Sequence, residues 1–333
     1  MVVYITVSSE SIQTLRREKL RIAAYDGDWV RNVSEAPFTV VLAVSNPNRD
    51  KASPFCTGTI IDPKFVLTAA HCVEDIDILL TGGDFPQIFA GIIKVYQTGS
   101  INVPDTIQKR KIHNENITIH PKYWPAWWQY VHPAPAQYDV ALVEVEPFKF
   151  NTAVNKAVLW NEAWLGDDGK FSTKDCKAYG WGDVTKKKTL DNRNGLRVIK
   201  VPQARHGMKA CSWLQGFHQA RLVCYTGRCL CPGDWGGPLV CDDKVVGIAH
   251  LLYPDTADCD GGFASFTKLH SAWMYVCPML DFIQEHVPSA PPQPINCQAP
   301  TLKYTMVALL SSTYTTFILI NAANYFAYRF IGC

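Results

Sequence analysis

Short apolar runs, broken by Gly, Pro, Asn and Asp, begin near Phe38 and continue over most of the chain. Such runs, bounded by turn residues, are typical of the strands of an all-β barrel or sandwich. The pattern therefore predicts strands within residues 38–44, 58–62, 65–70, 140–145 and 244–252.

The hydrophobic spacing changes near Ser271. From there, apolar side chains recur every three or four positions, which is the period of one face of a helix. The residues concerned are Trp273, Val276, Leu280, Ile283 and Val287. This spacing predicts a closing amphipathic helix.

The C-terminal part reads as a linker followed by an apolar tail. Residues 288–303 are rich in proline, which favours an extended linker. The tail, residues 304–333, contains an uncharged stretch over 306–327 that is long enough to cross a bilayer. Three interpretations stay open for it: a membrane-spanning helix, a segment removed when a lipid anchor is attached, and a buried helix.

Composition narrows the class of protein. With 19% charged residues and a net charge of +2, the chain has no dominant basic block, so we expect no nucleic-acid partner. The twelve cysteines include none with convincing zinc-finger spacing, and Cys229 and Cys231 alone are a weak metal signal. We therefore expect disulfides, an extracellular or cell-surface location, and neither metal nor cofactor.

Two further sequence features bear on secretion. Asn32 and Asn116 begin potential glycosylation sequons. The first residues make a poor signal peptide, because their apolar stretch is short and no basic segment precedes it. An internal anchor and an incomplete N-terminus are both left open.

Three separated motifs carry the chemistry. The first, at residues 67–72, reads LTAAHC; the second, at 138–142, reads YDVAL; the third, at 231–241, reads CPGDWGGPLVC. With these motifs in this order, the sequence resembles the chymotrypsin and trypsin family of serine proteases over about residues 36–287. The resemblance implies two packed six-stranded antiparallel β-barrels with a C-terminal helix, an all-β fold.

The resemblance also implies a domain layout. A protease-like domain would span residues 22–287, after an N-terminal segment, 1–21, that could be a pro-segment. The linker and tail would follow. The nearest candidate for activation cleavage is Arg21-Ile22, which lacks the paired glycines that the family prefers after the cut.

The same resemblance assigns roles to single residues. His71 matches the general base, Asp139 the carboxylate that orients it, and Gly233 the oxyanion-hole glycine. Asp234 matches the carboxylate that, in the family, pairs with the new N-terminal amine. Trp235 stands in the position of the nucleophilic serine. Since an indole offers one N–H donor and nothing that forms an acyl-enzyme, this residue predicts loss of catalysis.

Residues around the substrate pocket also depart from the family. His250, Leu251 and Leu252 stand where the family's pocket strand reads Ser-Trp-Gly, and Cys229 stands at the position that sets the charge of the pocket floor. Ala264 matches a family glycine near the pocket, which would narrow it. These changes predict that substrate recognition is altered together with the nucleophile.

The prediction is a non-catalytic homologue that binds an extracellular protein (a protease, an inhibitor or a substrate) as a regulator or decoy. The alternative is an active secreted endopeptidase whose serine codon was misread, since one base separates Ser (TCG) from Trp (TGG). The long spacing between His71 and Asp139 includes an aromatic-rich segment, residues 123–130, which could be a binding surface or could pack internally.

The resemblance implies four disulfides: Cys56–Cys72, Cys176–Cys241, Cys211–Cys224 and Cys231–Cys259. Cys229, Cys277, Cys297 and Cys333 have no counterpart in it. A Cys277–Cys297 bridge would tie the linker to the closing helix, although the sequence does not determine that pairing.

Overall fold

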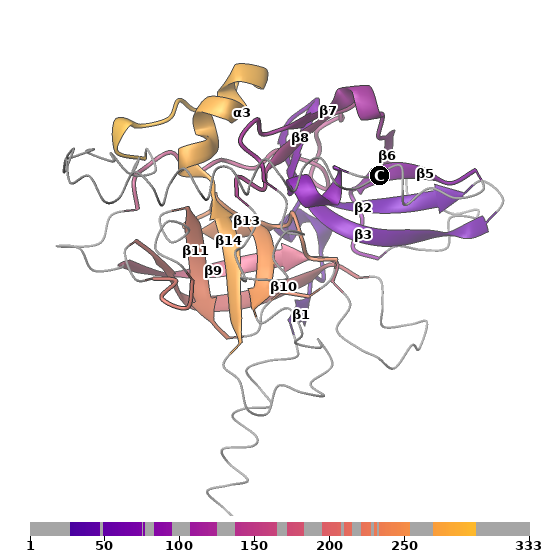
Figure 1. Ribbon diagram of the computed structural model, residues 1–333. Helices are drawn as coiled ribbons and strands as arrows, with labels where there is room; N and C mark the ends of the chain where they lie inside the picture. The colour runs from indigo at the N-terminus through magenta and orange to yellow at the C-terminus, as the bar shows by residue number, and fades with distance from the viewer. Residues whose placement is uncertain are drawn as a thin grey trace, which may run out of the picture. The chain divides into compact units, whose positions relative to one another are not determined.

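The structure, a computed structural model, describes residues 27–46, 49–74, 76, 83–94, 107–124, 137–164, 172–182, 195–207, 210–214, 221–227, 230–231, 233–253 and 269–297. The chain divides into two units, Met1–Ala299 and Pro300–Cys333. The second unit, the N-terminal segment 1–21 and the linker end from 298 onward lie outside the described residues. Figure 1 shows the arrangement of the described elements.

The C-terminal half of the first unit forms a closed antiparallel barrel. Its six strands pair in the ring order β9-β12-β13-β14-β11-β10, and β10 pairs back onto β9. A short strand, β1, adds to the outside of β10. The strands are β1 (Asp28–Trp29), β9 (Ser172–Gly180), β10 (Arg197–His206), β11 (Leu222–Thr226), β12 (Pro238–Cys241), β13 (Lys244–Tyr253) and β14 (His270–Tyr275).

The N-terminal half forms a second antiparallel sheet. Its strands follow the order β6-β5-β2-β3-β4-β8-β7, and within the described residues this sheet stays open. The strands are β2 (Thr39–Asn46), β3 (Arg49–Asp62), β4 (Phe65–Thr68), β5 (Phe85–Ala90), β6 (Gln108–Lys111), β7 (Ile117–Ile119) and β8 (Ala141–Glu144). Each apolar run predicted as a strand overlaps one of these strands, although the run 65–70 continues past β4 into the turn that follows it.

The helices are short. Single 3-10 turns are η1 (Val33–Glu35), η2 (Ala70–Cys72), η4 (Asn114–Asn116), η7 (Cys277–Met279) and η8 (Ile295–Cys297). The one α-helix of the described residues is α3 (Leu280–His286). The predicted all-β class with a C-terminal helix is confirmed, and the described strands of the N-terminal sheet form a half-barrel.

The predicted closing helix is wrong in its first part. Trp273 lies in β14, between β11 and β13, and the helix begins only after the 3-10 turn that contains Cys277. From Ser271 to Tyr275 every residue of β14 is buried, so both faces of the strand are covered and no polar alternation distinguishes it from a helix. Leu280 and Ile283, by contrast, do lie on the buried face of α3.

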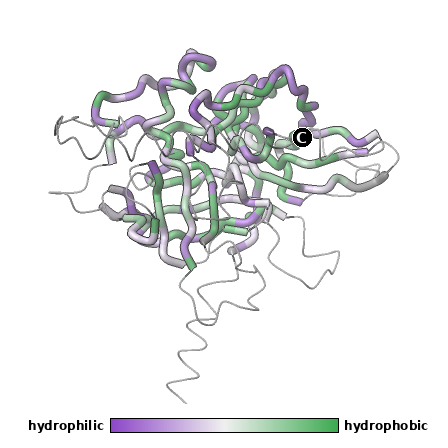
Figure 2. Tube along the Cα trace, in the orientation of Figure 1, coloured by the Kyte–Doolittle hydropathy of each residue, from purple (hydrophilic) through white to green (hydrophobic). Residues whose placement is uncertain are grey.

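Buried apolar side chains join the two sheets into one core. The largest cluster includes Leu42 and Ile60 from the N-terminal sheet together with Leu239 and Ile248 from the barrel. Figure 2 shows hydrophobic positions concentrated along the strands. Among the described residues no helix is both long and apolar enough to cross a membrane, and the apolar tail lies outside them.

Disulfides connect neighbouring elements of this core. Cys56 bonds Cys72, Cys176 bonds Cys241, and Cys211 bonds Cys224, the pairs that the resemblance implies. Cys277 bonds Cys297, which ties residues after α3 back to the start of η7. Cys231 is disulfide-bonded as well. Cys229, Cys259 and Cys333 lie outside the described residues.

Candidate active site

His71 is carried by the 3-10 turn η2, directly after β4. Ala69 and Ala70 before it are fully buried, and their small side chains let the turn lie close against the sheet. The Cys56–Cys72 disulfide fastens the other side of the turn to β3. The imidazole itself stays 30% exposed, so it is accessible on the side away from the core.

Asp139 lies just before β8, and its carboxylate is completely buried. Tyr138, before it, has a φ of 50°, a conformation that few residues other than glycine adopt. Two ring contacts restrain Tyr138: His120 stacks on it at 4.6 Å and the Arg221 guanidinium lies 4.3 Å from its centre. This backbone turns the Asp139 side chain inward toward His71.

His71 and Asp139 form two hydrogen bonds. The imidazole Nδ1 donates to Asp139 Oδ2 at 2.7 Å, and the backbone N–H of His71 donates to Oδ1 at 2.9 Å. His71 thus donates one hydrogen bond to each oxygen of the carboxylate. This is the arrangement in which an aspartate orients a histidine and stabilises its charged form.

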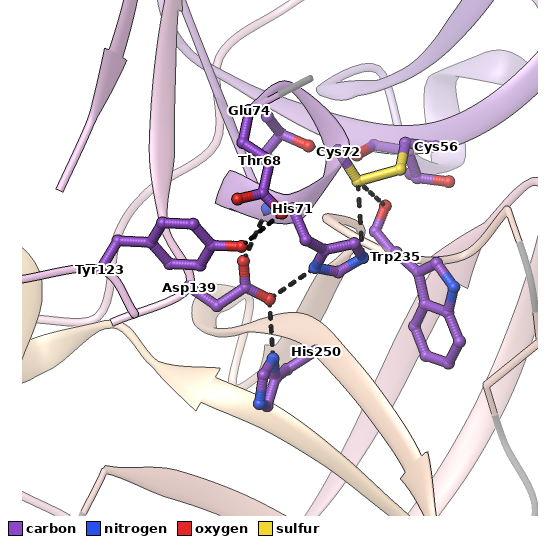
Figure 3. Close-up of polar contacts among 10 residues, drawn as sticks. Cys56, Thr68, His71, Cys72, Glu74, Tyr123, Asp139, Trp235 and His250 are labelled. Carbon is purple, nitrogen blue, oxygen red and sulfur yellow. Dashed lines mark hydrogen bonds and ion pairs between the residues drawn. A yellow bond between two sulfur atoms is a disulfide. The ribbon is translucent and has the colours of Figure 1, made fainter. Parts of the chain in front are cut away.

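His250 is a third member of this cluster. It lies in β13 at a β-bulge, because the pairing with β14 shifts register between Ala249 and Leu251 and leaves His250 as the extra residue. A bulge redirects a side chain, and here the His250 Nδ1 lies 2.7 Å from Asp139 Oδ2. Both imidazoles therefore meet the same carboxylate oxygen, as Figure 3 shows.

The two charged partners shift one another's pKa. Burial alone would raise the pKa of Asp139, but the charge of His71 and the hydrogen bonds from His250 and His71 outweigh it and hold that pKa far below its usual range. Burial tends to lower the pKa of His71, and the Asp139 carboxylate, helped by Glu74, more than compensates, so the net shift is upward. The cluster thus favours an ionised carboxylate beside a proton-binding imidazole.

Trp235 lies on the other side of His71 from Asp139 (Figure 3). Its indole is half-buried and packs against the main core cluster. The two ring centres are 6.2 Å apart with an angle of 68° between the rings, an edge-on contact. The side chain that faces the imidazole is therefore an aromatic ring, in the position where the motif implies a serine hydroxyl.

The backbone around Trp235 is a tight, hydrogen-bonded turn. Its carbonyl accepts from the Thr57 N–H at 2.8 Å, and Gly236 donates to the Ala249 carbonyl at 2.8 Å. Gly236 has a φ of +79°, and a Cβ there would overlap the Thr68 hydroxyl and the Thr57 carbonyl. Only glycine fits that position. This hydrogen-bonded backbone turn around residue 235, called the frame below, is intact although the side chain that it carries has changed.

Asp234 lies under the same turn, 4% exposed. Its carboxylate accepts hydrogen bonds from the backbone N–H groups of Gly182 at 2.7 Å and Cys231 at 2.8 Å. Burial raises the pKa of Asp234 to about 6, although both hydrogen bonds and the charge of Arg197 act in the opposite direction. The segment that would supply an amine partner, from Ile22, lies outside the described residues.

Two backbone amides of the turn make no backbone hydrogen bond within the described part of the chain. Neither the Gly233 nor the Trp235 N–H donates a hydrogen bond to another described residue. Gly233 has a φ of +101°, and a Cβ there would lie 3.1 Å from the Trp181 carbonyl oxygen. Backbone N–H groups presented by such a turn can bind a carbonyl or carboxylate oxygen.

His71, Asp139 and His250 are also a set of donors that suits a transition metal, with their ligand atoms within 4.8 Å of one another. In this arrangement the two imidazole Nδ1 atoms both point at Asp139 Oδ2, which therefore takes the position that a metal ion between the two rings would need. Hydrogen bonds therefore account for the cluster. The second such group, Cys56, His71 and Cys72, contains the two sulfurs of a disulfide.

The structure brings together four of the residues singled out from the sequence, His71, Asp139, Trp235 and Gly233, on adjoining segments. Sequence reasoning placed His250 at the pocket mouth and missed its bond to Asp139. The signal was available, since a side chain with a ring nitrogen replaced the family's serine in β13. Leu251 is half-buried and Leu252 is 7% exposed. Cys229 and Ala264, the other pocket residues, lie outside the described residues.

Part of the aromatic segment is described. The Tyr123 hydroxyl donates to Glu74 at 2.8 Å, close to His71, and Trp124 is 55% exposed. Residues 125–130 lie outside the described part. Both sequons fall on described turns: Asn32 is exposed and caps η1, and Asn116 ends η4. Whether they are glycosylated stays a prediction.

Comparisons with known proteins all match trypsin or other serine proteases. A protein-family model described as Trypsin matches residues 27–273. A trypsin of Simulium vittatum is 31% identical over 201 residues, which cover 58% of this chain and 68% of that protein. Serine protease 28 of Mus musculus is 25% identical over 66% of this chain and 76% of its own. The snake venom serine protease NaSP of Naja atra is 27% identical over 65% of each.

Proposed function

The chain belongs to the trypsin family, and from that premise we propose that it is a non-catalytic member that binds protein without cutting it. The observation that carries the proposal is Trp235. It stands in the nucleophile position with its ring edge-on to His71. An indole cannot attack a carbonyl to form an acyl-enzyme, so the first chemical step of the family's mechanism has no nucleophile.

The bulk of Trp235 adds to this effect. In the family's mechanism a peptide carbonyl must lie between the nucleophile, the general base and the oxyanion-hole amides. The indole takes up part of that space beside His71. Removing a triad nucleophile alone costs a factor of about 10⁶ in turnover in a well-studied protease. We expect this chain to do no better.

Features that support binding are nevertheless retained. Beyond Ile248, β13 has no ladder with β12, so among the described residues Leu251, Leu252 and Tyr253 pair with β14 alone and present one edge. An extended peptide can add to such an edge, and the Gly233 and Trp235 amides offer donors nearby. An extended segment of another protein, entering the cleft as an inhibitor or substrate would, is the ligand that this geometry favours.

The proposed location is extracellular. Four disulfides within the described residues are typical of proteins that fold in an oxidising compartment. One relative is, by its name, a venom protein. A regulator or decoy outside the cell would meet the proteases, inhibitors and substrates for which the cleft is suited.

A binding assay with intact-mass analysis tests the proposal. The sequence-verified protein would be incubated with a panel of protein inhibitors of trypsin-like proteases. We expect at least one complex in which neither chain is cleaved, and its affinity should fall at least tenfold in Leu251→Arg, which puts a charge on the open edge of β13. Lys156→Glu, on an exposed loop, is the matched control. Cleaved inhibitor or substrate would contradict the proposal, as would equal binding by both variants.

An active endopeptidase is the second candidate, favoured by one observation. The His71–Asp139 pair keeps both hydrogen bonds of a working general base. If residue 235 were a serine, the pair would be ready to activate it. Resequencing that codon in independent samples decides between the two, because a serine codon would remove the basis of the non-catalytic proposal.

A further inference from the structure

We propose that His250 is a positioning residue that shares Asp139 with His71, and that it keeps the buried carboxylate paired whether or not His71 is in place. This inference goes beyond the proposed function, because it concerns what the aspartate does in this chain. In the family template, the aspartate orients the catalytic histidine. Here it has a second imidazole partner from another strand.

The first step is the geometry. The His71 and His250 Nδ1 atoms both lie 2.7 Å from Asp139 Oδ2, within ordinary charge-assisted hydrogen-bond length. Oδ1 is occupied by the His71 backbone N–H. The carboxylate thus accepts three hydrogen bonds, and Figure 3 shows the two rings approaching it from different sides.

The second step is the direction of the His250 bond. An ionised carboxylate only accepts hydrogen bonds, so the His250 ring must carry a proton on Nδ1. Its Nε2 is buried and has no hydrogen-bond partner among the described residues. The ring therefore uses one nitrogen for Asp139, and the side chain, 3% exposed, is held there by the bulge in β13.

The third step is where the partners come from. His71 and Asp139 belong to segments of the N-terminal sheet, η2 after β4 and the residue pair before β8. His250 belongs to β13 of the barrel. The His250–Asp139 bond therefore crosses between the two sheets, whereas the His71–Asp139 bond stays within one. The His250–Asp139 hydrogen bond thus helps to join the N-terminal sheet to the barrel.

Two consequences follow. A folded protein loses much of its stability when a buried carboxylate loses its only partner. Here, loss of the His71 side chain leaves Asp139 paired with His250. His71, in turn, has to share the charge of Asp139, and the other charged group that faces it is Glu74. Removing the His250 donor should therefore raise the pKa of His71 further.

Unfolding measurements on three variants test the first consequence. His250→Leu keeps a similar volume and removes the donor, so we expect the folding equilibrium constant to fall at least tenfold, as for loss of a hydrogen bond to a charged group. His250→Asn, which can still donate an amide N–H, should recover a large part of this loss. His71→Leu should cost less than His250→Leu. Equal losses in the two leucine variants, or no recovery with asparagine, would overturn the proposal.

His206→Asn is the matched control, because it also removes a buried imidazole that bonds through Nδ1, in that case to the Leu222 carbonyl. It should leave the His71 titration unchanged. Any general loss of stability from replacing a buried histidine appears in this variant as well, so only an effect specific to position 250 supports the inference.

Nuclear magnetic resonance of the protein, labelled at histidine nitrogen, gives a test that observes the hydrogen-bonded protons directly, first in the unmodified protein and then in His71→Leu. We expect two strongly downfield Nδ1 protons, from His71 and His250, and the His250 signal should persist in His71→Leu. A single downfield proton, or loss of both in that variant, would overturn the proposal. None of these readouts measures hydrolysis, so a catalytically active protein would defeat the proposed function and leave this inference standing.

Discussion

The turn beneath Trp235 and the partly exposed side chains of Trp235, Leu251 and His71, which line the proposed cleft, are under very different physical constraints. In the turn, Gly236 and Gly237 have neighbours so close that an added Cβ would overlap them, and the same holds for Gly182, which packs against Asp234 from the end of β9. Asp234 fills the remaining space and bonds two backbone N–H groups. Almost no other residue could occupy these positions without moving the backbone.

The cleft side is looser. Trp235 and Leu251 are half-buried, and His71 is 30% exposed. A side chain that projects from a fixed backbone into partly open space can change without disturbing the core. The comparison shows that the fold can keep the backbone turn of the family while the residue in the nucleophile position changes. Close packing limits which residues fit the turn, whereas the partly exposed side chains are limited mainly by the reaction that they must perform.

The largest expected effect comes from breaking the frame. Gly236→Ala should destabilise the protein by about 3–5 kcal/mol, because the new methyl group meets the Thr68 hydroxyl and lies 2.9 Å from the Ala69 nitrogen, at a φ of +79°. Denaturant unfolding measures it. Gly83→Ala is the matched control, since it has a φ of +87° and nothing within 4 Å, and should cost only about 1 kcal/mol. Similar costs for both would show that conformation, not packing, limits the turn.

The next effect concerns the charge in the frame. The folded pKa of Asp234 is about 6, above the unfolded value of 3.8, so its contribution is most favourable below pH 3.8 and is lost as pH rises through 6. The shift of about two units corresponds to about 3 kcal/mol. Between pH 3.5 and 7, Asp234→Asn should therefore gain about that much stability relative to the parent. A difference between the two proteins that does not vary with pH would contradict this assignment.

Another buried titratable group, His206, also makes stability depend on pH, and it lies in the barrel, outside the turn and the proposed cleft. Burial lowers the pKa of His206 to about 4, below its ordinary value of 6.5, although its bond to Leu222 acts the other way. The unfolded chain therefore binds a proton first, and stability is lost as pH falls from 6.5 toward 4, by up to about 3 kcal/mol. His206→Asn should weaken this acid sensitivity. Unfolding curves at pH 4 and pH 7 test it, and an unchanged difference would refute it.

The smallest expected effect comes from the cleft. Trp235→Phe keeps an aromatic ring at a half-buried position, so it should change stability by no more than about 1.5 kcal/mol. Trp235→Ser restores a hydroxyl beside His71 but not the predicted pocket, so peptide hydrolysis should stay at least about a hundredfold below that of an active trypsin. Robust hydrolysis by the serine variant would show that the pocket changes at Leu252 and Cys229 do not matter.

Much of the fold was predictable, because short apolar runs bounded by turn residues mark β2, β4, β8 and β13 directly in the sequence. The boundary of the C-terminal helix was not. Trp273 and Val276 share a helical spacing with Leu280, but β14 is covered on both faces, so its pattern carries no strand signal. The resemblance carried by the three motifs predicted the roles of His71, Asp139 and Trp235, and it could do so because each motif, like each apolar run, is local in the sequence.

What could not be predicted is the contact between distant segments. His250 is 111 residues from Asp139 along the chain, and its side chain reaches the carboxylate only because a bulge in β13 redirects it. No local pattern encodes a bulge whose register depends on β14. Likewise, the sequence showed that Gly236 and Gly237 are present but not that Thr57 and Thr68 require them.

Covalent labelling with a fluorophosphonate tests the central claim most directly. This reagent phosphonylates an activated serine and needs little of the substrate pocket, so it reports on the nucleophile at position 235. The sequence-verified protein, before and after treatment with trypsin, should show no labelling of the cleft, while Trp235→Ser provides the comparison with a hydroxyl in place. Stoichiometric labelling of the unaltered protein, mapped by mass spectrometry to a residue beside His71, would contradict the account.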